Sequence, residues 1–392
     1  NSPLNAIRAS RLQPRSGQMM TANDEPSKET AAIPEPASDT TYSVSGGLLA
    51  RLARLDISIA FTSYQSGLLY FIGRNGEGGI NVHQSAMPKP MGLCMDSGSA
   101  GSGLTMSSSY QIMRLENILQ GNQRINDAFD ACYVPRTIHV TGNLDAHDVG
   151  IDENGRVIFV NTRFNCLATT SARHSFEVVW RPPFITALVD EDRCHLNGLA
   201  MENGKPRYVT AVSRSNTIDG WRDRRASGGI VIDVQTNEIV CTGLSMPHSP
   251  RMHDGQLWLL NAGTGELGTV VATPEGSYQF EAKAFCPGFL RGLSFHGNLA
   301  FVGLSKPRYN RFEGLELDQR LSDADSEPWC GVQVIDLNTG SCVDWFRIDG
   351  TISELYDVEV VPGVVCPMAV SPFSHEAAGL ITFAGMPAGD ST

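Results

Sequence analysis

Charged residues are scarce in this chain of 392 residues, because Asp, Glu, Lys and Arg together make up 18% of it. About a quarter is usual in soluble domains, and coiled coils and disordered tails carry more. Basic residues are the scarcer kind, with 30 Lys and Arg against 42 Asp and Glu and a formal net charge of −12. Binding to a phosphate backbone needs a basic face. The composition therefore predicts no nucleic-acid partner.

Long apolar runs and the common catalytic motifs are also missing. No stretch of about 18 apolar residues occurs, so the sequence predicts no membrane span. The nine cysteines are scattered, odd in number and without a Cys-x-x-Cys pair, which favours reduced thiols and a cytoplasmic location. No Walker loop, Gly-x-Ser-x-Gly, His-Glu-x-x-His or dinucleotide fingerprint is present.

Glycine is abundant, with 39 residues, and it punctuates short apolar runs. Examples are GLLYFIG (67–73), GRVIFVN (155–161) and GNLAFVG (297–303). Runs of this length between turn formers are typical of antiparallel strands. Residues 24–42 are instead rich in Pro, Ser, Thr and Glu, a composition that cannot bury enough apolar surface to fold. We expect a disordered leader over 1–44, one all-β domain over 45–366 and a C-terminal tail over 367–392.

A repeat runs through the expected domain. Each unit begins with a polar or sulfur-bearing residue, then a small residue and an aliphatic one, followed by a hairpin. These six anchors are Met91, His147, Asn197, His248, Arg291 and Tyr356. Units of roughly 40–50 residues with four strands each are typical of β-propeller blades. The run 354–363 offers a first strand without a blade after it, whereas 56–86 offers three strands without a first one. The sequence predicts a six-bladed β-propeller, closed by one C-terminal strand that joins three N-terminal strands.

Several long segments resemble a known but uncharacterised bacterial family. They include WRPPFITAL, GLSMPHSPRMHDGQLWLLNAG and RGLSFHGNLAFVGLSK. The family consists of conserved hypothetical proteins with a domain of unknown function, and the resemblance implies a propeller-like fold over about residues 45–366 and no established activity. Asn197-Gly198-Leu199-Ala200 is also similar to a strand of the gluconolactonase and regucalcin propellers. That likeness implies Asn197 as a ligand of a divalent cation.

The anchors are expected to form one ring, because first strands line the central channel of a propeller. Side chains two positions earlier point the same way along a strand, which predicts a second ring. Its members are Lys89, Asp145, His195, Met246, Phe289 and Glu354.

Four residues of these rings are candidate metal ligands, namely His147, His195, Asn197 and His248. Imidazoles that converge from rigid strands can hold a divalent ion such as Zn, Mn, Fe or Ca with an open position. Tyr356, Arg291 and Glu354 are the candidate catalytic residues, suited to proton transfer and oxyanion stabilisation. The alternative is a wet polar channel that binds only water.

A set of residues in loops at equivalent places predicts a rim around one end of the channel. The candidates for substrate binding there are Tyr64, Arg163, Arg214, Trp221 and Arg308, accompanied by Lys306. Cations around the channel of an acidic protein suggest a small anionic ligand, and a solvated surface is the alternative. The loop 219–229 reads as a flap over the channel or as a long hairpin connection.

Two functions remain open on the sequence. The first is a metal-dependent enzyme, a lyase or hydrolase that acts on a small anionic substrate in the central channel. The second is a non-catalytic propeller that binds a ligand or a protein partner.

Overall fold

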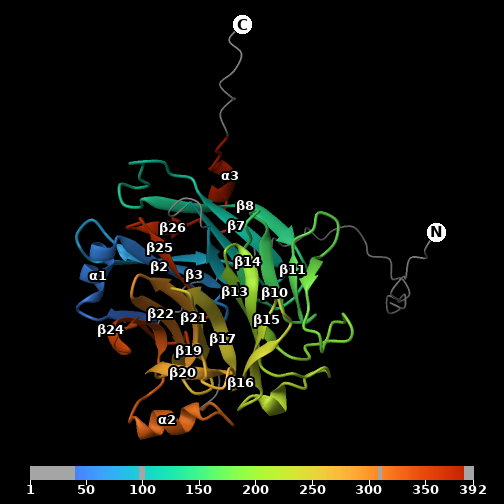
Figure 1. The fold of residues 1–392 in the computed structure, drawn as a ribbon. Coiled ribbons are helices and arrows are strands. Elements are labelled where there is room, and N and C mark those ends of the chain that lie inside the picture. Colours follow the sequence, from blue (N-terminus) through green and yellow to red (C-terminus); the bar gives the residue numbers. More distant parts are fainter. Residues whose placement is uncertain (1–39, 97–101, 308–310, 384–392) are drawn as a thin grey trace, which may run out of the picture. The chain divides into compact units, whose positions relative to one another are not determined.

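The computed structural model describes residues 40–96, 102–307 and 311–383. These residues form six sheets of mainly antiparallel strands, one for each blade of a six-bladed β-propeller. The predicted fold class is therefore confirmed. Figure 1 shows the sheets following one another in the order of the sequence colours. Within the described residues, none of the helices has the length and apolar character needed to span a membrane.

The first half of the ring comprises blades 1 to 3, whose strands follow one another from the first strand outward. Blade 1 holds β25 (Val358–Pro362), β2 (Ile57–Ser63), β3 (Leu68–Arg74) and β4 (Ile80–Ala86). Blade 2 holds β5 (Leu93–Met95), β6 (Gly103–Ser108), β7 (Gln111–Asn117), β8 (Ala131–Val140) and β26 (Pro367–Ala369). Blade 3 holds β9 (Ala146–Ile151), β10 (Val157–Asn161), β11 (Cys166–Thr169) and β12 (Glu177–Trp180).

The second half of the ring follows the same order. Blade 4 holds β13 (Leu196–Glu202), β14 (Lys205–Ala211), β15 (Gly229–Asp233) and β16 (Ile239–Leu244). Blade 5 holds β17 (Pro247–His253), β18 (Gln256–Asn261), β19 (Glu266–Ala272) and β20 (Tyr278–Phe285). Blade 6 holds β21 (Phe289–His296), β22 (Leu299–Ser305), β23 (Cys330–Asp336), β24 (Ser341–Asp349) and β1 (Thr41–Val44).

Four helical segments accompany the blades in the part of the chain that the structure describes. They are α1 (Leu48–Leu55), the short 3-10 helix η1 (Arg222–Arg224), α2 (Leu317–Asp323) and α3 (Glu376–Gly379). The amphipathic pattern of 45–56 thus forms α1, which buries Leu48 and Leu52. In Figure 1, α2 lies at the periphery of the propeller, below β20.

Closure of the ring follows the predicted scheme. Strand β25 pairs with β2 in antiparallel register from Ile57 opposite Pro362 to Phe61 opposite Val358, and Figure 1 shows the red strand beside the blue one. Two further strands lie outside the expected range 45–366. Strand β1 pairs with β24, and β26 runs parallel to β8. The ends of the chain therefore add a strand to the outer edges of blades 6 and 2.

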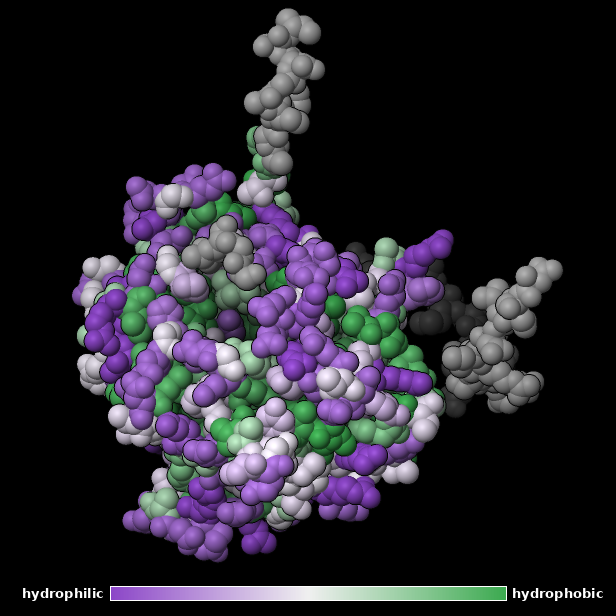
Figure 2. Space-filling model, in the orientation of Figure 1, coloured by the Kyte–Doolittle hydropathy of each residue, from purple (hydrophilic) through white to green (hydrophobic). Residues whose placement is uncertain are grey.

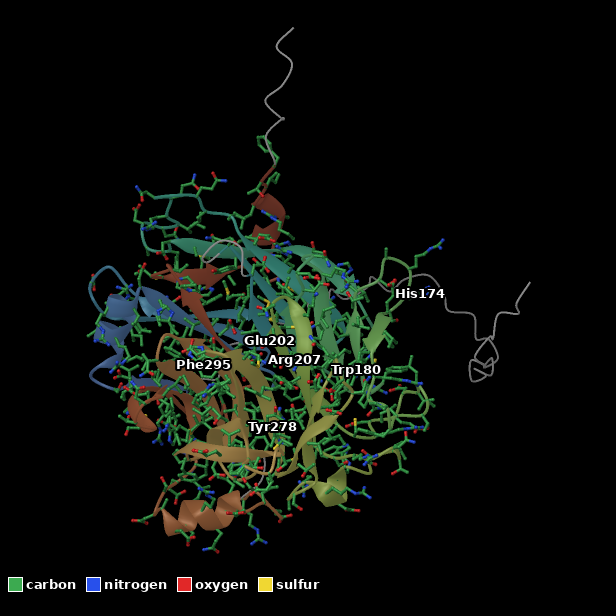
Figure 3. All side chains as sticks on the ribbon, viewed as in Figure 1. His174, Trp180, Glu202, Arg207, Tyr278 and Phe295 are labelled. Carbon is green, nitrogen blue, oxygen red and sulfur yellow. The ribbon has the colours of Figure 1, made fainter. Side chains whose placement is uncertain are left out.

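The core lies between neighbouring blades. Between blades 6 and 1, for example, Phe346 packs against Phe61 with 5.8 Å between ring centroids, and α1 covers this cluster with Leu48 and Leu52. All nine cysteines are free thiols. On the face shown in Figure 2, apolar residues occur in small groups between polar ones. Figure 3 shows Glu202 and Arg207 side by side on the β13–β14 hairpin, an ion pair at 3.3 Å.

The six first strands are linked by an alternation of residue types directly after the anchors. Blades 1, 3 and 5 place Asp357, Asp148 and Ser249 there, whereas blades 2, 4 and 6 place Gly92, Gly198 and Gly292. Each oxygen-bearing residue accepts a backbone hydrogen bond from the next blade. The donors are Leu93 to Asp357 at 2.8 Å, Leu199 to Asp148 at 2.9 Å and Gly292 to Ser249 at 3.0 Å. The glycines leave room for the following blade, since a methyl group at Gly198 would collide with Cδ of Pro250.

A buried charge cluster joins the same strands. Arg251 of β17 donates to both carboxylate oxygens of Asp148, at 2.7 and 3.1 Å, and lies 3.6 Å from the carboxylate of Asp357. Burial raises the pKa of Asp357 to about 7 and that of Glu359 to about 8, although Arg251 opposes both shifts. Three blades are therefore tied together by one guanidinium group.

Candidate functional site

A cavity of about 570 Å³ lies where the first strands begin, and residues of all six blades line it. Nine of the twelve expected ring residues face this cavity: Met91, Asp145, His147, His195, Met246, Phe289, Arg291, Glu354 and Tyr356. Lys89, Asn197 and His248 are not among its lining residues. The repeat therefore brings most of the predicted rings to one place.

The backbone before the first strands differs from the expectation of a continuous strand. Asp145, His195 and Met246 have left-handed φ values of 52°, 52° and 49°, and each precedes its strand by one residue. Lys89 has the same conformation, with φ of 51°. Non-glycine residues rarely adopt it and pay a conformational cost. Four of the six residues of the second ring are thus placed by a turn before the strand, whereas Phe289 is the first residue of β21.

This turn fixes the tautomer of His147. The Nδ1 atom lies 2.8 Å from the carbonyl oxygen of Asp145 and 2.8 Å from the hydroxyl of Thr162, which itself donates to the carbonyl of Leu196 at 2.6 Å. Because a carbonyl only accepts, Nδ1 carries the hydrogen and Nε2 keeps a lone pair. Burial lowers the pKa of His147 to about 4, with Asp145 opposing the shift. His147 is therefore a neutral acceptor on the cavity wall.

His248 has the same turn but a different partner. Its Nδ1 donates to the carbonyl of Met246 at 2.8 Å, and Nε2 lies 3.4 Å from the amide nitrogen of Asn197. The amide oxygen of Asn197 accepts from the hydroxyl of Thr210 at 2.8 Å. Burial holds the pKa of His248 well below its ordinary value. His248 and Asn197 thus bond to each other outside the cavity lining.

His195 forms a carboxylate–imidazole dyad with Asp192. Its Nδ1 lies 2.6 Å from Oδ2 of Asp192, while Oδ1 of the same carboxylate accepts the backbone N–H of His195 at 3.0 Å. Nε2 remains for a ligand or a substrate. This is the arrangement in which a carboxylate orients a histidine for general acid–base work. The imidazoles of His195 and His147 meet edge to face with 4.8 Å between centroids.

The four expected metal ligands do not form one set in this geometry. His147 and His195 face the cavity. In contrast, the Nε2 atom of His248 and the amide nitrogen of Asn197 form a hydrogen bond with each other. Within the described residues, no group of three or more His, Cys, Asp or Glu side chains is arranged to hold a metal ion.

Arg291 lies between two aromatic rings at the cavity. Its guanidinium carbon is 4.8 Å from the ring centre of Tyr356 and 5.6 Å from that of Phe289. Among the residues that the structure describes, Arg291 has no ion-pair partner. A guanidinium group that lines a cavity without a direct ion pair is suited to an anionic ligand.

Two buried hydrogen-bond donors also face the cavity without a partner in the described part of the chain. They are the hydroxyl of Tyr356 and the indole N–H of Trp221, and each residue is only 7% exposed. Burial raises the pKa of Tyr356 well above its ordinary value, so the phenol keeps its proton. Trp221 stacks on His195 with 4.2 Å between ring centroids. Buried polar groups usually have partners, so these two donors mark a place where a ligand would accept hydrogen bonds.

The predicted rim is only partly assembled. Tyr64, Trp221 and Lys306 line the cavity, as does Arg225 of the expected flap 219–229. Arg163 is not among the lining residues and forms a two-pronged ion pair with Asp190, at 2.5 and 2.6 Å. Arg214 is exposed and also outside the lining. Arg308 lies outside the described residues. The expectation of a common rim thus fails for Arg163 and Arg214, because similar loop positions do not impose similar side-chain directions.

Several lining residues were not predicted from the sequence. They include Asp192, Arg222, Arg225, Arg311, Phe312, Glu313 and Leu315. All lie in the connections 190–195, 219–229 and 311–316, where no periodicity guides a prediction. The three-residue spacing of Asp192 and His195 was the available signal for the dyad.

Comparisons with known proteins place the fold beside several solved structures. One is a nidogen/laminin complex, with 12% identity over 78% of this chain and 98% of that chain and a TM-score of 0.48. Others are a virginiamycin B lyase from Staphylococcus aureus, with 11% identity over 80% of this chain and 100% of that one and a TM-score of 0.37, and a luciferin-regenerating enzyme, with 11% identity over 79% and 92% and a TM-score of 0.40. No curated protein matches the sequence.

A family described as a domain of unknown function matches most of the chain. The match covers residues 47–370, which includes nearly every strand of the propeller and every lining residue named above. The resemblance seen in the sequence segments is therefore confirmed. The chain belongs to the family of the domain of unknown function DUF4915.

Proposed function

We propose that this protein is an enzyme, a lyase or hydrolase that acts by proton transfer on a small anionic substrate held in the central cavity. The observation that carries this proposal is the His195–Asp192 dyad in the same cavity as Arg291. The oriented imidazole of His195 supplies a general base. The guanidinium of Arg291, which forms no ion pair within the described residues, binds the negative charge of the substrate.

The roles follow from the protonation states of the side chains. His195 takes up a proton at Nε2, either from the substrate or from a water molecule that attacks it, and Asp192 stabilises the resulting imidazolium. The neutral phenol of Tyr356 donates a hydrogen bond, or a proton, to the oxygen where charge develops. His147 accepts a hydrogen bond at Nε2 and orients the substrate. Arg291 holds the anionic group.

The test compares turnover by wild-type protein with turnover by Asp192→Asn. A panel of small hydroxy acids and carboxylic esters is incubated with each protein and followed by proton NMR. For any compound that the wild type converts, Asp192→Asn should lower kcat by about 10²–10⁴-fold, as expected for loss of an oriented base. The surface pair His253 and Asp254, at 3.5 Å, supplies the matched control, since Asp254→Asn should leave kcat unchanged.

Two other outcomes would change the assignment. Equal kcat for Asp192→Asn and wild type would remove the dyad from the mechanism. Turnover that requires added Zn²⁺ or Mn²⁺ would favour the metal-dependent reaction that the sequence suggested.

A binding function without catalysis is the second candidate. The observation in its favour is the indole of Trp221, which lies against one face of the His195 ring and restricts access to it. Binding of panel members without conversion of any of them would favour this second function.

A further inference from the structure

The cavity has an apolar wall that the proposed chemistry does not use. It consists of Phe289, Phe312 and Leu315, which line the cavity together. The rings of Phe289 and Phe312 stack with 6.1 Å between their centroids, and Leu315 packs in the same cluster. This wall begins beside Arg291, whose guanidinium contacts Phe289.

The apolar wall is a built structure and not a loose loop. The backbone N–H of Phe312 donates to the carboxylate of Asp318 at 2.9 Å, and that of Leu315 donates to the carbonyl of Phe312 at 3.1 Å. Behind it, α2 buries Leu317 and Leu321. A ligand would therefore meet the wall already formed, which reduces the entropy lost on binding.

The polar groups lie on the other side of Arg291 in a connected arc. Ring contacts run from Arg291 to Tyr356 at 4.8 Å, from Tyr356 to His147 at 5.6 Å and from His147 to His195 at 4.8 Å. Trp221 ends the arc on His195. One charged group thus separates an apolar wall from a hydrogen-bonding arc.

The charges of the lining favour a ligand with a single negative charge. Five basic residues (Arg222, Arg225, Arg291, Lys306 and Arg311) stand against four acidic ones (Asp145, Asp192, Glu313 and Glu354), which gives a formal balance of +1. Two of the arginines that line the cavity already form ion pairs, Arg222 with Asp219 at 2.9 Å and Arg311 with Glu313 at 3.7 Å. Burial opposes ionisation of Asp145, but its neighbours His147, His195 and Arg291 lower its pKa, so Asp145 stays ionised and repels a doubly charged group.

The size of the cavity excludes a minimal anion as its full occupant. At about 570 Å³ it lies within the range of about 300–1,000 Å³ that holds ligands of drug size. An ion such as acetate would leave the apolar wall facing water.

We propose that the cavity binds an organic monocarboxylate with an aromatic body, its carboxylate at Arg291 and Tyr356 and its ring against Phe289, Phe312 and Leu315. This proposal rests on the proposed function for the anion contact at Arg291. It adds the substrate class, because the apolar wall contributes binding energy through burial of the ring.

The first experiment measures binding to the full-length protein by isothermal titration calorimetry. The probes are acetate, phenylacetate, 2-naphthylacetate and the neutral phenylacetamide. We expect phenylacetate to bind at least about tenfold more tightly than acetate, 2-naphthylacetate to bind no more weakly than phenylacetate, and phenylacetamide to bind far more weakly. Equal affinities for acetate and phenylacetate would overturn the aromatic assignment, and so would the absence of binding by all four probes.

Variants of the wall residues test whether the apolar wall causes the tighter binding of phenylacetate. Leu315→Ala and Phe312→Ala should each weaken phenylacetate binding by roughly three- to tenfold and leave acetate binding unchanged, with thermal melts to show that both variants fold. Phe373→Ala, at a side chain that is 57% exposed, is the matched control. Unchanged phenylacetate binding in both folded wall variants would contradict the proposal.

The result for Arg291→Gln separates this proposal from the proposed function. One outcome is that Arg291→Gln binds none of the carboxylate probes, while the wall variants bind phenylacetate as the wild type does. This outcome would overturn the aromatic subsite and retain the anion-binding role of Arg291. Equal binding of phenylacetate and phenylacetamide would show that the carboxylate contributes no affinity. This result would overturn the anion-binding role of Arg291 in the proposed function and retain the aromatic subsite.

Discussion

Tyr356 and Trp221 each bury a donor that no described residue accepts. An unsatisfied buried polar group costs on the order of 1–3 kcal/mol, so these two positions lower the stability of the free protein. Such a cost is expected at a binding site, where a ligand supplies the missing acceptor.

Replacing Tyr356 with Phe should therefore stabilise the ligand-free protein. The change removes the hydroxyl and keeps the ring, and we expect a gain of about 1 kcal/mol in the free energy of unfolding, measured by urea denaturation. The same variant should bind phenylacetate more weakly. Tyr42→Phe is the matched control, because the hydroxyl of Tyr42 accepts a hydrogen bond from Gln84, and that variant should lose stability. A loss of stability in Tyr356→Phe would show that its hydroxyl has a partner.

His147 makes stability depend on pH in a defined direction. Its pKa is about 4 in the folded protein and 6.5 is its ordinary value. The unfolded chain therefore binds the proton first, and stability falls as the pH falls from about 6.5 towards 4. His147→Asn keeps a donor for the carbonyl of Asp145 but removes the titration, so it should flatten this part of the profile by roughly 2–3 kcal/mol.

The measurement is the free energy of unfolding at several pH values for wild type and His147→Asn. His174→Asn serves as the control, because His174 lies in an exposed loop away from the centre of the propeller. An identical slope in the wild type and His147→Asn would mean that His147 titrates normally in the folded protein.

At the scale of the element, the first strands depend on glycine for their close approach. Gly198 has Cδ of Pro250 and the hydroxyl of Thr210 on the side where a Cβ would stand. The strand of Gly198 cannot shift away from Pro250, because Leu199 of the same strand donates its backbone N–H to Asp148 of blade 3. The space at this position is therefore fixed from both sides.

Gly198→Ala should destabilise the propeller by roughly 1–3 kcal/mol through overpacking. The methyl group would collide with Cδ of Pro250. Gly76→Ala is the control, since no atom lies within 4 Å of the place that its methyl group would take, and it should change stability by no more than about 0.5 kcal/mol. Equal melting temperatures for the two variants would contradict the packing explanation.

The repeat explains how much of the elements could be predicted. Anchors at equivalent places must meet, because every blade turns the same way into the channel, and for this reason the sequence alone predicts one cavity for His147, Arg291 and Tyr356. The repeat could not rank His147 above His248, since that difference depends on whether Asn197 reaches the second nitrogen. Nor could it locate Asp192 or Phe312, which lie in connections that follow no period.

At the scale of the whole molecule, Arg251 holds three blades through a buried charge cluster. Removing one partner of such a cluster leaves carboxylates buried without a counter-charge, which costs about 3–5 kcal/mol. Burial already raises the pKa values of Asp357 and Glu359 while Arg251 opposes this shift.

Arg251→Met should thus destabilise the propeller by about 3–5 kcal/mol, and more at high pH than at low pH. Without Arg251 both carboxyl groups hold their protons more firmly in the folded state than at the pKa values of about 7 and 8 that they have beside it. Stability is therefore lost as the pH rises above their ordinary pKa values of 3.8 and 4.5, and the loss continues beyond about pH 8. Urea denaturation at acidic and alkaline pH gives the comparison. Arg156→Met is the control, because Arg156 pairs with Asp152 through a side chain that is 59% exposed, and this variant should cost less than about 1 kcal/mol. A penalty independent of pH would show that the carboxyl groups do not titrate in this cluster.

Gly alternates with Asp or Ser directly after the anchors, so the odd-numbered and even-numbered blades of the ring differ. Each oxygen faces forward to a glycine blade, and each glycine leaves room for atoms of the following oxygen-bearing blade. The molecule is in this sense three pairs of blades and not six equal ones. A ring with an odd number of blades would set two glycines or two acceptors side by side. Gain or loss of a single blade would therefore disrupt these contacts between first strands, whereas gain or loss of a pair of blades would preserve them.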